Sequence, residues 1–321
     1  MRLKDGKKAP DFIIIGAMKS GTTSLHAILA SRPDVYMPDK ELYFFDVDDF
    51  EQHPDFFIKS RSGWTVHDYD NDFPAYYDWY TRSFEGASDH VLIGEDTTTY
   101  LASRSAPERI NRLLPEVKLI VMLRDPVDRA YSHYWHSVAA GRISVSFEDH
   151  LRLAPGNTMR RGDYKEQLMR YRPFLEDNRL KVIIFEEFIS NQSAIVADIL
   201  SYLGLESVSE PTADISRNRA TVPLCIPLRL CANGVYRLLA RRLSLRNIPN
   251  MPGYDAGSGA GSRRPRLSKL FDLYRHHLPS RAYPAMKADT RAFLEKVYRK
   301  RNAGLSELIG RDVSCYWPYM D

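Results

Sequence analysis

The chain has 321 residues, a formal net charge of +4, 44% hydrophobic residues and 27% charged residues. These values are near those of folded proteins, so a chain that is disordered throughout is excluded. The length could hold one large α/β domain or two small ones. The apolar run at residues 12–15 is much shorter than a signal-peptide core or a membrane span, so the sequence predicts neither an export signal nor an anchor.

The cysteines bear on metal binding and on the compartment. Cys225, Cys231 and Cys315 have neither the spacing of a zinc site nor an even count. The sequence therefore predicts no structural metal and no disulfide framework, although Cys225 and Cys231 could pair under oxidising conditions. A reducing, cytoplasmic location fits this pattern best.

Four short apolar runs, at residues 11–15, 91–93, 118–123 and 181–185, alternate with helical patterns. The helical spacing is clear at residues 24–31 and at residues 195–203, where Gly204 ends it. Continuous apolar strands between helices are typical of a parallel sheet covered on both faces. We therefore expect an α/β fold: a single domain over residues 1–321, with a central parallel β-sheet flanked by helices.

The connecting segments give further expectations. Residues 1–10 are polar and basic and are predicted to be flexible, and so is the loop at residues 252–265, which is rich in Gly, Ser and Pro. A polar loop is expected at Glu186 and Glu187, after the fourth strand. From Thr290 the apolar spacing predicts one long amphipathic helix that ends at Gly310.

Residues 16–23 (GAMKSGTT) lie between the first strand and the first helix, where backbone N–H groups and the helix dipole can converge on a phosphate. The segment is nearly a Walker A loop, but Thr22 occupies the lysine position and the loop's lysine is Lys19. A nucleoside triphosphatase would lose the lysine that contacts its γ-phosphate. A lysine at the crest of the loop could instead reach the bridging oxygen between a 5'-phosphate and the group that it releases.

This segment resembles the 5'-phosphosulfate-binding loop of sulfotransferases that use 3'-phosphoadenosine 5'-phosphosulfate (PAPS). Residues 124–132 (RDPVDRAYS) are similar to the family's 3'-phosphate-binding motif, in which the first arginine and the last serine hold the phosphate. Arginine gives a bidentate, charge-assisted grip. The resemblance implies a P-loop-like fold of the sulfotransferase and nucleotide kinase type. The cofactor-binding residues that it implies are Lys19, Ser20, Gly21, Thr22, Thr23, Arg124 and Ser132.

Residues 38–46 (PDKELYFFD) resemble the Lys-Glu-x-x-Phe-Phe motif of the branch that includes heparan sulfate N- and O-sulfotransferases and bacterial relatives. In that branch the glutamate is the proposed general base. The resemblance therefore implies this role for Glu41 and a contact of Lys40 with the acceptor.

Three weaker segments extend the resemblance. Residues 94–100 (GEDTTTY) and 161–168 (RGDYKEQL) are similar to a strand end and a cleft segment of the family, which implies acceptor contacts for Glu95 and Tyr164. Residues 280–286 (SRAYPAM) align with a loop whose basic residues meet the 3'-phosphate, so Arg281 is a further cofactor-binding candidate. Two departures argue against a heparan acceptor: Asp96 stands where O-sulfotransferases have a lysine, and Tyr43 where several have a histidine.

The resemblance implies transfer of a sulfuryl group from PAPS to a hydroxyl or amine, with release of 3'-phosphoadenosine 5'-phosphate (PAP) and with Lys19 and Glu41 as catalytic residues. Because a sulfuryl group carries less negative charge than a phosphoryl group, no metal is expected. The expected acceptor is a small molecule or a glycan, such as a carbohydrate, a glycolipid or a metabolite, and no nucleic acid partner is expected. One alternative is a P-loop kinase that uses ATP and magnesium, with Asp125 as a metal ligand. Another is a non-catalytic module that binds a nucleotide or a polyanion.

Between Ile215 and Tyr254 the sequence has no acidic residue but seven arginines. Such a stretch can bind an anionic partner or can be a solvated helix face. Within it, residues 227–245 interleave leucines with arginines. A peripheral helix on a membrane surface is one interpretation, and a helix packed beside the acceptor cleft is the other.

Overall fold

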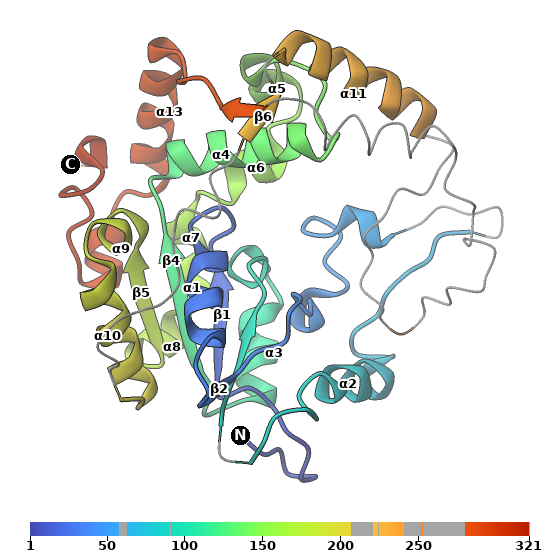
Figure 1. Ribbon diagram of the computed structural model, residues 1–321, viewed down its shortest axis with the longest axis vertical. Coiled ribbons are helices and arrows are strands. Elements are labelled where there is room, and N and C mark those ends of the chain that lie inside the picture. The colour runs from blue at the N-terminus through green and yellow to red at the C-terminus, as the bar shows by residue number, and fades with distance from the viewer. Residues whose placement is uncertain are drawn as a thin grey trace.

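The computed structural model describes residues 1–57, 63–89, 91–206, 221–223, 225–240, 252 and 280–320. Its centre is a sheet of five strands in the order β2-β3-β1-β4-β5, and every neighbouring pair is parallel (Figure 1). The predicted α/β fold with a central parallel sheet is thereby confirmed. The strands are β1 (Phe12–Gly16), β2 (Val35–Tyr36), β3 (Leu92–Asp96), β4 (Lys118–Leu123) and β5 (Leu180–Ile184). The two-residue edge strand β2 was not predicted, because it is too short to leave an apolar run.

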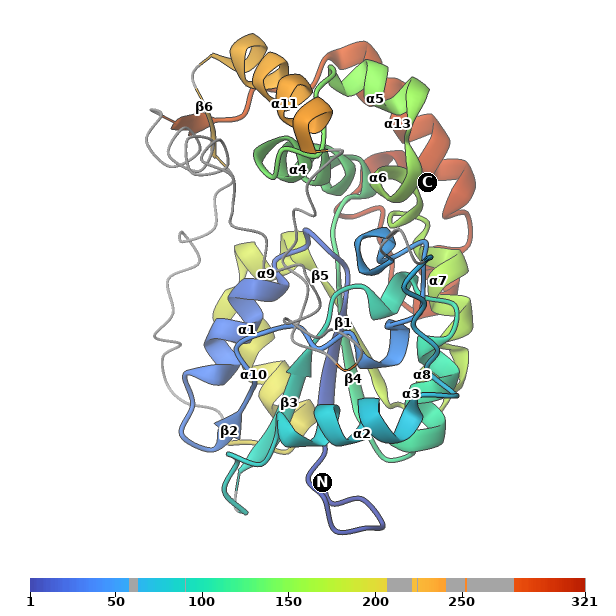
Figure 2. The same ribbon diagram turned by 90° about the vertical axis from the view of Figure 1, so that its right-hand side faces the viewer.

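Helices cover both faces of the sheet. Figure 2 shows α1, α9 and α10 on one side of it and α3, α7 and α8 on the other. A second, two-stranded antiparallel sheet pairs β6 (Thr221–Pro223) with β7 (Ser280–Ala282). The helices described are α1 (Thr22–Ala30), α2 (Phe73–Arg82), α3 (Ala106–Leu113), α4 (Pro126–Ala139), α5 (Phe147–Leu153), α6 (Gly156–Arg160), α7 (Tyr164–Arg170), α8 (Arg172–Glu176), α9 (Phe185–Ser190), α10 (Gln192–Leu203), α11 (Ile226–Ala240), α13 (Ala288–Arg301) and α14 (Leu305–Ile309).

The alternation of side chains along each strand explains the two cores. Phe12 and Ile14 of β1 pack into a cluster with residues of α1, α9 and α10. Ile13 and Ile15 point the other way, into the larger cluster with residues of α3, α4, α7 and α8. Because both faces are buried, the strands are continuous apolar runs rather than alternating ones.

The C-terminal region differs from its prediction. The expected single helix from Thr290 is two helices, α13 and α14. The first helix ends at Asn302, whose side chain is buried. Its Nδ2 donates to the carbonyl of Gly162, and its Oδ1 accepts from the backbone amide of Lys165. Gly304 then adopts φ +81°, a left-handed conformation that favours glycine. The predicted helix end at Gly310 is confirmed.

The predicted polar loop at Glu186 and Glu187 is also wrong, because both residues lie in the first turn of α9. Carboxylates are favourable there, since they face the positive end of the helix dipole. A polar pair directly after a strand therefore marked a helix start rather than a loop.

The remaining predictions concern residues 1–10, the loop at residues 252–265, the cysteines and membrane spans. Arg2 and Lys8 pair in an antiparallel bridge, while the flexibility of residues 1–10 stays a prediction. The predicted loop at residues 252–265 lies outside the described residues, apart from Pro252. The three cysteines are free and exposed. Among the described helices, none is long and apolar enough to cross a membrane.

Gly94 provides a test of how tightly the sheet packs against its neighbours. A Cβ atom at this position of β3 would lie 2.2 Å from Cζ of the buried Phe12 ring. Gly94→Ala should therefore lower the free energy of unfolding by about 1–3 kcal/mol, measured by urea denaturation.

The matched control for this change is Gly234→Ala in α11. A Cβ there would meet nothing closer than Cβ of Ser144 at 3.8 Å. This variant should be stabilised by up to about 1 kcal/mol through helix propensity. A Gly94→Ala protein as stable as the wild type would contradict the packing described.

Candidate active site

The turn between β1 and α1 has the geometry of an anion-binding loop. Lys19 and Gly21 adopt φ +72° and +89°, which turn the chain sharply before the helix begins at Thr22. A Cβ at Gly21 would lie 2.7 Å from the Phe185 ring, so only glycine fits there. Within the described residues, the amides of Lys19, Gly21, Thr22 and Thr23 donate to no protein acceptor. These N–H groups and the helix dipole are available to a phosphate.

The loop contains one cation, Lys19, and a second cation, Arg124, lies beside it. Burial of the Lys19 side chain, together with the neighbouring Arg124 guanidinium, lowers the pKa of Lys19. Nη1 of Arg124 donates to the carbonyl of Lys19 at 3.3 Å, and its guanidinium lies 5.0 Å from the centroid of the Phe185 ring. Neither cation is paired with a carboxylate in the part of the chain that the structure describes. Two adjacent cations without a counter-charge fit an anionic ligand.

The turn that carries Arg124 is fixed from several sides. The side chain of Asp125 caps α4 by accepting from the amide of Val127 at 2.8 Å, and it also accepts from the Tyr319 hydroxyl at 3.0 Å. Burial, with the charge of Asp128, raises the pKa of Asp125 to about 6. Because Asp125 is buried and occupied as a helix cap, the arrangement does not favour the alternative in which it binds magnesium.

Partners outside α4 hold the same turn. The Tyr164 hydroxyl donates to the carbonyl of Arg124 at 2.8 Å. The amide of Asp125 donates to one carboxylate oxygen of Glu186 at 2.9 Å, and the indole of Trp317 donates to the other at 3.1 Å. The C-terminal segment thus fixes the position of Arg124.

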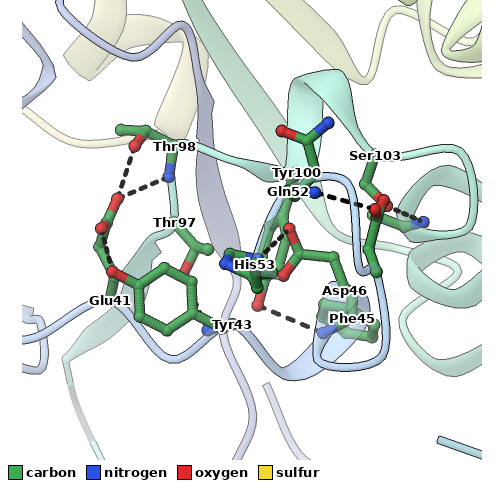
Figure 3. A network of polar contacts seen from close by, with 12 residues as sticks. Glu41, Tyr43, Phe45, Asp46, Gln52, His53, Thr97, Thr98, Tyr100 and Ser103 are labelled. Carbon is green, nitrogen blue, oxygen red and sulfur yellow. Dashed lines mark hydrogen bonds and ion pairs between the residues drawn. The ribbon is translucent and has the colours of Figure 1, made fainter. Parts of the chain in front are cut away.

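Glu41 lies beside the start of the loop. Its Oε1 accepts hydrogen bonds from the amide and the hydroxyl of Thr98 at 2.8 and 2.6 Å, and its Oε2 accepts from the Tyr43 hydroxyl at 2.5 Å (Figure 3). Thr98 follows β3, and its carbonyl lies 3.0 Å from where a Cβ of Gly16 would be. The carboxylate of Glu41 is therefore anchored to a residue that touches the first residue of the loop.

The buried carboxyl group of Glu95 is connected through hydrogen bonds to the backbone next to Glu41. Glu95 is fully buried and accepts hydrogen bonds from Tyr80 at 2.6 Å, Tyr100 at 2.7 Å and Thr97 at 3.0 Å. The Thr97 hydroxyl in turn accepts from the amide of Leu42 at 3.1 Å. Burial raises the pKa of Glu95 to about 7, although the three hydrogen bonds act in the opposite direction. Glu95 thus positions the backbone next to Glu41.

A second buried pair lies on the other side of Tyr43. Nε2 of His53 is 2.9 Å from Oδ2 of Asp46, and the rings of Tyr43 and His53 meet edge to face with centroids 4.9 Å apart (Figure 3). Tyr43 itself has φ +56°, an uncommon conformation for a large residue. The packing around Tyr43 therefore holds its hydroxyl against Glu41.

Arg161 connects Gln52, the neighbour of His53, to the loop between β1 and α1. It is 6% exposed, and it donates to Oε1 of Gln52 at 3.0 Å and to Sδ of Met18 at 2.7 Å. Burial, and the nearby charge of Arg129, lower the pKa of Arg161 to about 10. Met18 belongs to the loop, so the buried guanidinium of Arg161 links the loop to the segment that contains Gln52.

The structure brings most of the predicted cofactor residues and the predicted base to one edge of the sheet. Ser20 is fully buried, and Ser132 lies within α4 with 4% of its surface exposed. Lys40 is exposed, as an acceptor contact requires. The backbone of Arg281 lies in β7, but its side chain is outside the described part of the structure.

Glu95 and Tyr164 are placed differently from their prediction as acceptor-binding residues. Both are fully buried, and their polar atoms are bonded to protein groups. This arrangement makes them supports for Glu41 and Arg124 rather than groups open to an acceptor. Asp96, the departure from the family lysine, lies 3.5 Å from Nδ1 of His26 in α1.

Several residues of the site were not found from the sequence: Thr98, Arg161 and the pair of Asp46 and His53. The run of three threonines after the second predicted strand was the available signal for Thr98, because hydroxyls at a strand end can hold a carboxylate. Nothing local distinguishes Arg161 from other arginines, since its role comes from burial between distant segments.

Comparisons with known proteins agree with this geometry. The model of the sulfotransferase family matches residues 10–210. A crystal structure of a sulfotransferase from Alicyclobacillus acidocaldarius has 25% sequence identity and a TM-score of 0.63, and the match covers 97% of this chain and 99% of that one.

Curated relatives are similar over different shares of the chain. Bovine (Bos taurus) bifunctional heparan sulfate N-deacetylase/N-sulfotransferase 2 is 25% identical over an alignment of 317 residues, which covers 95% of this chain and 30% of the relative. Human heparan sulfate glucosamine 3-O-sulfotransferase 3B1 is 28% identical over an alignment of 210 residues, which covers 63% of this chain and 48% of the relative. The chain thus spans less than half the length of these relatives.

Since the family model matches well over half of its length, the chain belongs to the sulfotransferase family. The resemblance predicted from residues 16–23, 124–132 and 38–46 is confirmed at the level of the family. The P-loop-like fold of sulfotransferases is confirmed with it.

The raised pKa of Glu95 predicts a pH-dependent stability. The folded-state pKa of about 7 lies above the ordinary value of 4.5, so the folded protein retains a proton that the unfolded chain releases in this window. The stabilising contribution is complete below pH 4.5 and is lost as the pH rises through about 7. Glu95→Gln cannot ionise, so its free energy of unfolding relative to the wild type should rise by about 3 kcal/mol across the window.

Urea denaturation of both proteins at several pH values measures this difference. The comparison isolates Glu95, because the other titrating groups are common to both proteins. A difference that stays constant from pH 4 to pH 8 would contradict the assignment.

Proposed function

We propose that the chain transfers a sulfuryl group from PAPS to a hydroxyl or amine acceptor. The observation that carries the proposal is the meeting of three groups at one sheet edge: the loop with Lys19, the guanidinium of Arg124, and the carboxylate of Glu41. The loop follows β1, Arg124 follows β4, and Glu41 is held by Thr98, which follows β3. Ligands of parallel sheets bind at such an edge.

The residues fit the two anionic ends of the donor. The loop amides with Lys19, Thr22 and Thr23 would hold the 5'-phosphosulfate, and Arg124 with Ser132 would hold the 3'-phosphate. The support for this fit is the lowered pKa of Lys19, since a cation that is partly buried beside another cation is stabilised by an anion. Arg281 stays a predicted contact of the 3'-phosphate.

When bound, PAPS supplies an activated sulfuryl group. Glu41 accepts the proton of the acceptor as the new bond to sulfur forms and the bond from sulfur to the 5'-phosphate oxygen breaks. The hydrogen bonds from Thr98 and Tyr43 orient the Glu41 carboxylate for this step. Lys19 and the loop amides stabilise the negative charge that develops on the departing phosphate of PAP.

Metal-free transfer stays a prediction. Among the described residues, no three His, Cys, Asp or Glu side chains are grouped to hold a metal ion. A sulfuryl group carries less negative charge than a phosphoryl group, so the cations of the chain itself suffice for the proposed reaction.

We propose a glycan or a small molecule as the acceptor: a carbohydrate, a glycolipid or a metabolite. The named activities of the curated relatives concern heparan sulfate, which supports a carbohydrate. The lysine that O-sulfotransferases carry at the position of Asp96 is absent here, which favours a glycan other than heparan sulfate. A cytoplasmic location remains the prediction from the cysteines.

Substitution of the two proposed catalytic residues tests the proposal. Lys19→Ala and Glu41→Gln should each lower the turnover of sulfuryl transfer on the order of a hundredfold, because one removes charge stabilisation and the other removes the base. The measurement is transfer of label from sulfur-labelled PAPS to a panel of saccharide, phenol and amine acceptors.

Two surface changes are matched controls for these variants. Lys7→Ala removes an exposed ion pair with Asp78, and Glu176→Gln removes one with Arg172. Both should leave turnover within about twofold of the wild type, since exposed ion pairs contribute little. Full activity of either Lys19→Ala or Glu41→Gln would remove that residue from its assigned role.

Ligand-dependent stabilisation separates the proposal from a P-loop kinase. PAP without magnesium should raise the free energy of unfolding by about 2.7 kcal/mol at a concentration one hundred times its dissociation constant. ATP with magnesium should raise the free energy of unfolding much less. Thermal unfolding with each ligand measures both effects. Stabilisation by ATP with magnesium and none by PAP would favour the kinase.

A further inference from the structure

The helix α11 exposes a row of apolar residues on its outer side, although Ile226 and Leu230 of the same helix pack against the core. Its inward-facing polar residues are Arg229 and Asn233, which are 3% and 0% exposed. Its outward-facing residues include Leu228, Val235 and Leu238, which are 54%, 57% and 69% exposed. Surface helices normally bury their apolar residues and expose their polar ones, so the outward face of α11 requires a separate explanation.

The inward face shows why the helix sits this way. The guanidinium of Arg229 donates to the carbonyl of Ala139 at 2.7 Å, and the amide of Asn233 donates to the carbonyls of Val138 and Ile143 at 2.9 and 2.7 Å. These carbonyls lie at and just beyond the C-terminal end of α4, where a helix leaves its acceptors unsatisfied. These polar contacts, together with the packing of Ile226 and Leu230 against the core, fix which face of α11 is exposed.

The outward face forms a continuous stripe. Leu228, Cys231, Val235 and Leu238 are separated by three, four and three positions, so they follow one side of a helix over about 15 Å. Cys231 is exposed, like the three aliphatic residues. We call these four residues the outer stripe. Figures 1 and 2 both place α11 at the outer margin of the molecule, at the end where α4 lies.

Charge indicates what covers the outer stripe. Arg237 is exposed on α11 outside the outer stripe, and the sequence from Ile215 to Tyr254 contains seven arginines and no acidic residue. A second copy of this chain would bring two such basic helices together, which is electrostatically unfavourable. An anionic lipid surface accepts the aliphatic side chains and attracts the arginines.

We propose that the outer stripe of α11 docks the protein on an anionic membrane surface, with the helix lying flat in the headgroup region. This goes beyond the proposed function, because it concerns where the reaction takes place and not the reaction itself. α4 begins two residues after Arg124 and carries α11 near its other end, so α4 connects the docking helix to the nucleotide-binding edge of the sheet.

The native cysteines allow a direct test. A protein with Cys225→Ser and Cys315→Ser is labelled at Cys231 with an environment-sensitive fluorophore. The control protein has Cys225→Ser and Cys231→Ser and carries the label at Cys315. Vesicles of phosphatidylcholine with phosphatidylglycerol should shift the emission at Cys231 to the blue and leave that at Cys315 unchanged. Added salt should weaken the effect, and phosphatidylcholine alone should give little.

Substitutions test the same surface in the unlabelled chain. Leu228→Glu with Leu238→Glu should lower partitioning onto phosphatidylglycerol vesicles at least about tenfold. Arg237→Gln should lower it about fivefold. Ile189→Glu is the matched control, since Ile189 is 49% exposed on α9, away from the outer stripe. Unchanged thermal midpoints and unchanged sulfuryl transfer in solution would show that these variants are folded.

Three results would overturn the proposal. The first is no emission change at Cys231 with any vesicle. The second is equal partitioning of the wild type and the double variant. The third is a dimer in sedimentation that Leu228→Glu with Leu238→Glu dissociates, without vesicle binding, because a second copy of the chain would then cover the stripe. A failure of sulfuryl transfer in the wild type would instead contradict the proposed function and leave the vesicle results unaffected.

Discussion

The carboxyl ends of β3, β1 and β4 lie side by side in one parallel sheet, and every group assigned to the reaction depends on that adjacency. β1 ends in the loop with Lys19, β4 ends at Arg124, and β3 runs into Thr98, which holds Glu41. Close contact between these ends requires glycine at Gly16, because a Cβ there would lie 3.0 Å from the carbonyl of Thr98. The spacing of the strands thus places anion-binding amides, cations and a carboxylate around one point.

Buried polar groups then fix the side chains at this edge. Glu95 accepts hydrogen bonds from the hydroxyls of Tyr80, Thr97 and Tyr100. The Thr97 hydroxyl also accepts a hydrogen bond from the backbone amide of Leu42, next to Glu41. Such a network rigidifies a site when every member has a partner. The backbone beside Glu41 is therefore positioned by residues that are themselves buried.

The sequence allowed the sheet, the loop and the family to be predicted, because these features depend on local patterns. The apolar run before Gly16 and the glycine and lysine positions after it determine a strand, a turn and a helix start. The supporting roles of Glu95 and Tyr164 were not predictable, since they depend on burial by segments far apart in the chain. Asn302, which divides the C-terminal helix, is a similar case: its partners Gly162 and Lys165 are distant in sequence.

Two positions of this chain depart from the heparan sulfate sulfotransferase motifs that it resembles. Its departures are at Tyr43, which donates to Glu41, and at Asp96, which pairs with His26. Both lie beside the proposed base rather than in the donor loop. We therefore expect substitutions at these positions to affect acceptor binding more than nucleotide binding.

A crystal structure of the chain with PAP tests the central claim most directly. The account predicts electron density for the 5'-phosphate against the amides of residues 19–23 and density for the 3'-phosphate at Arg124 and Ser132. Density at another place on the protein, or a loop closed by its own side chains in the presence of saturating PAP, would contradict it.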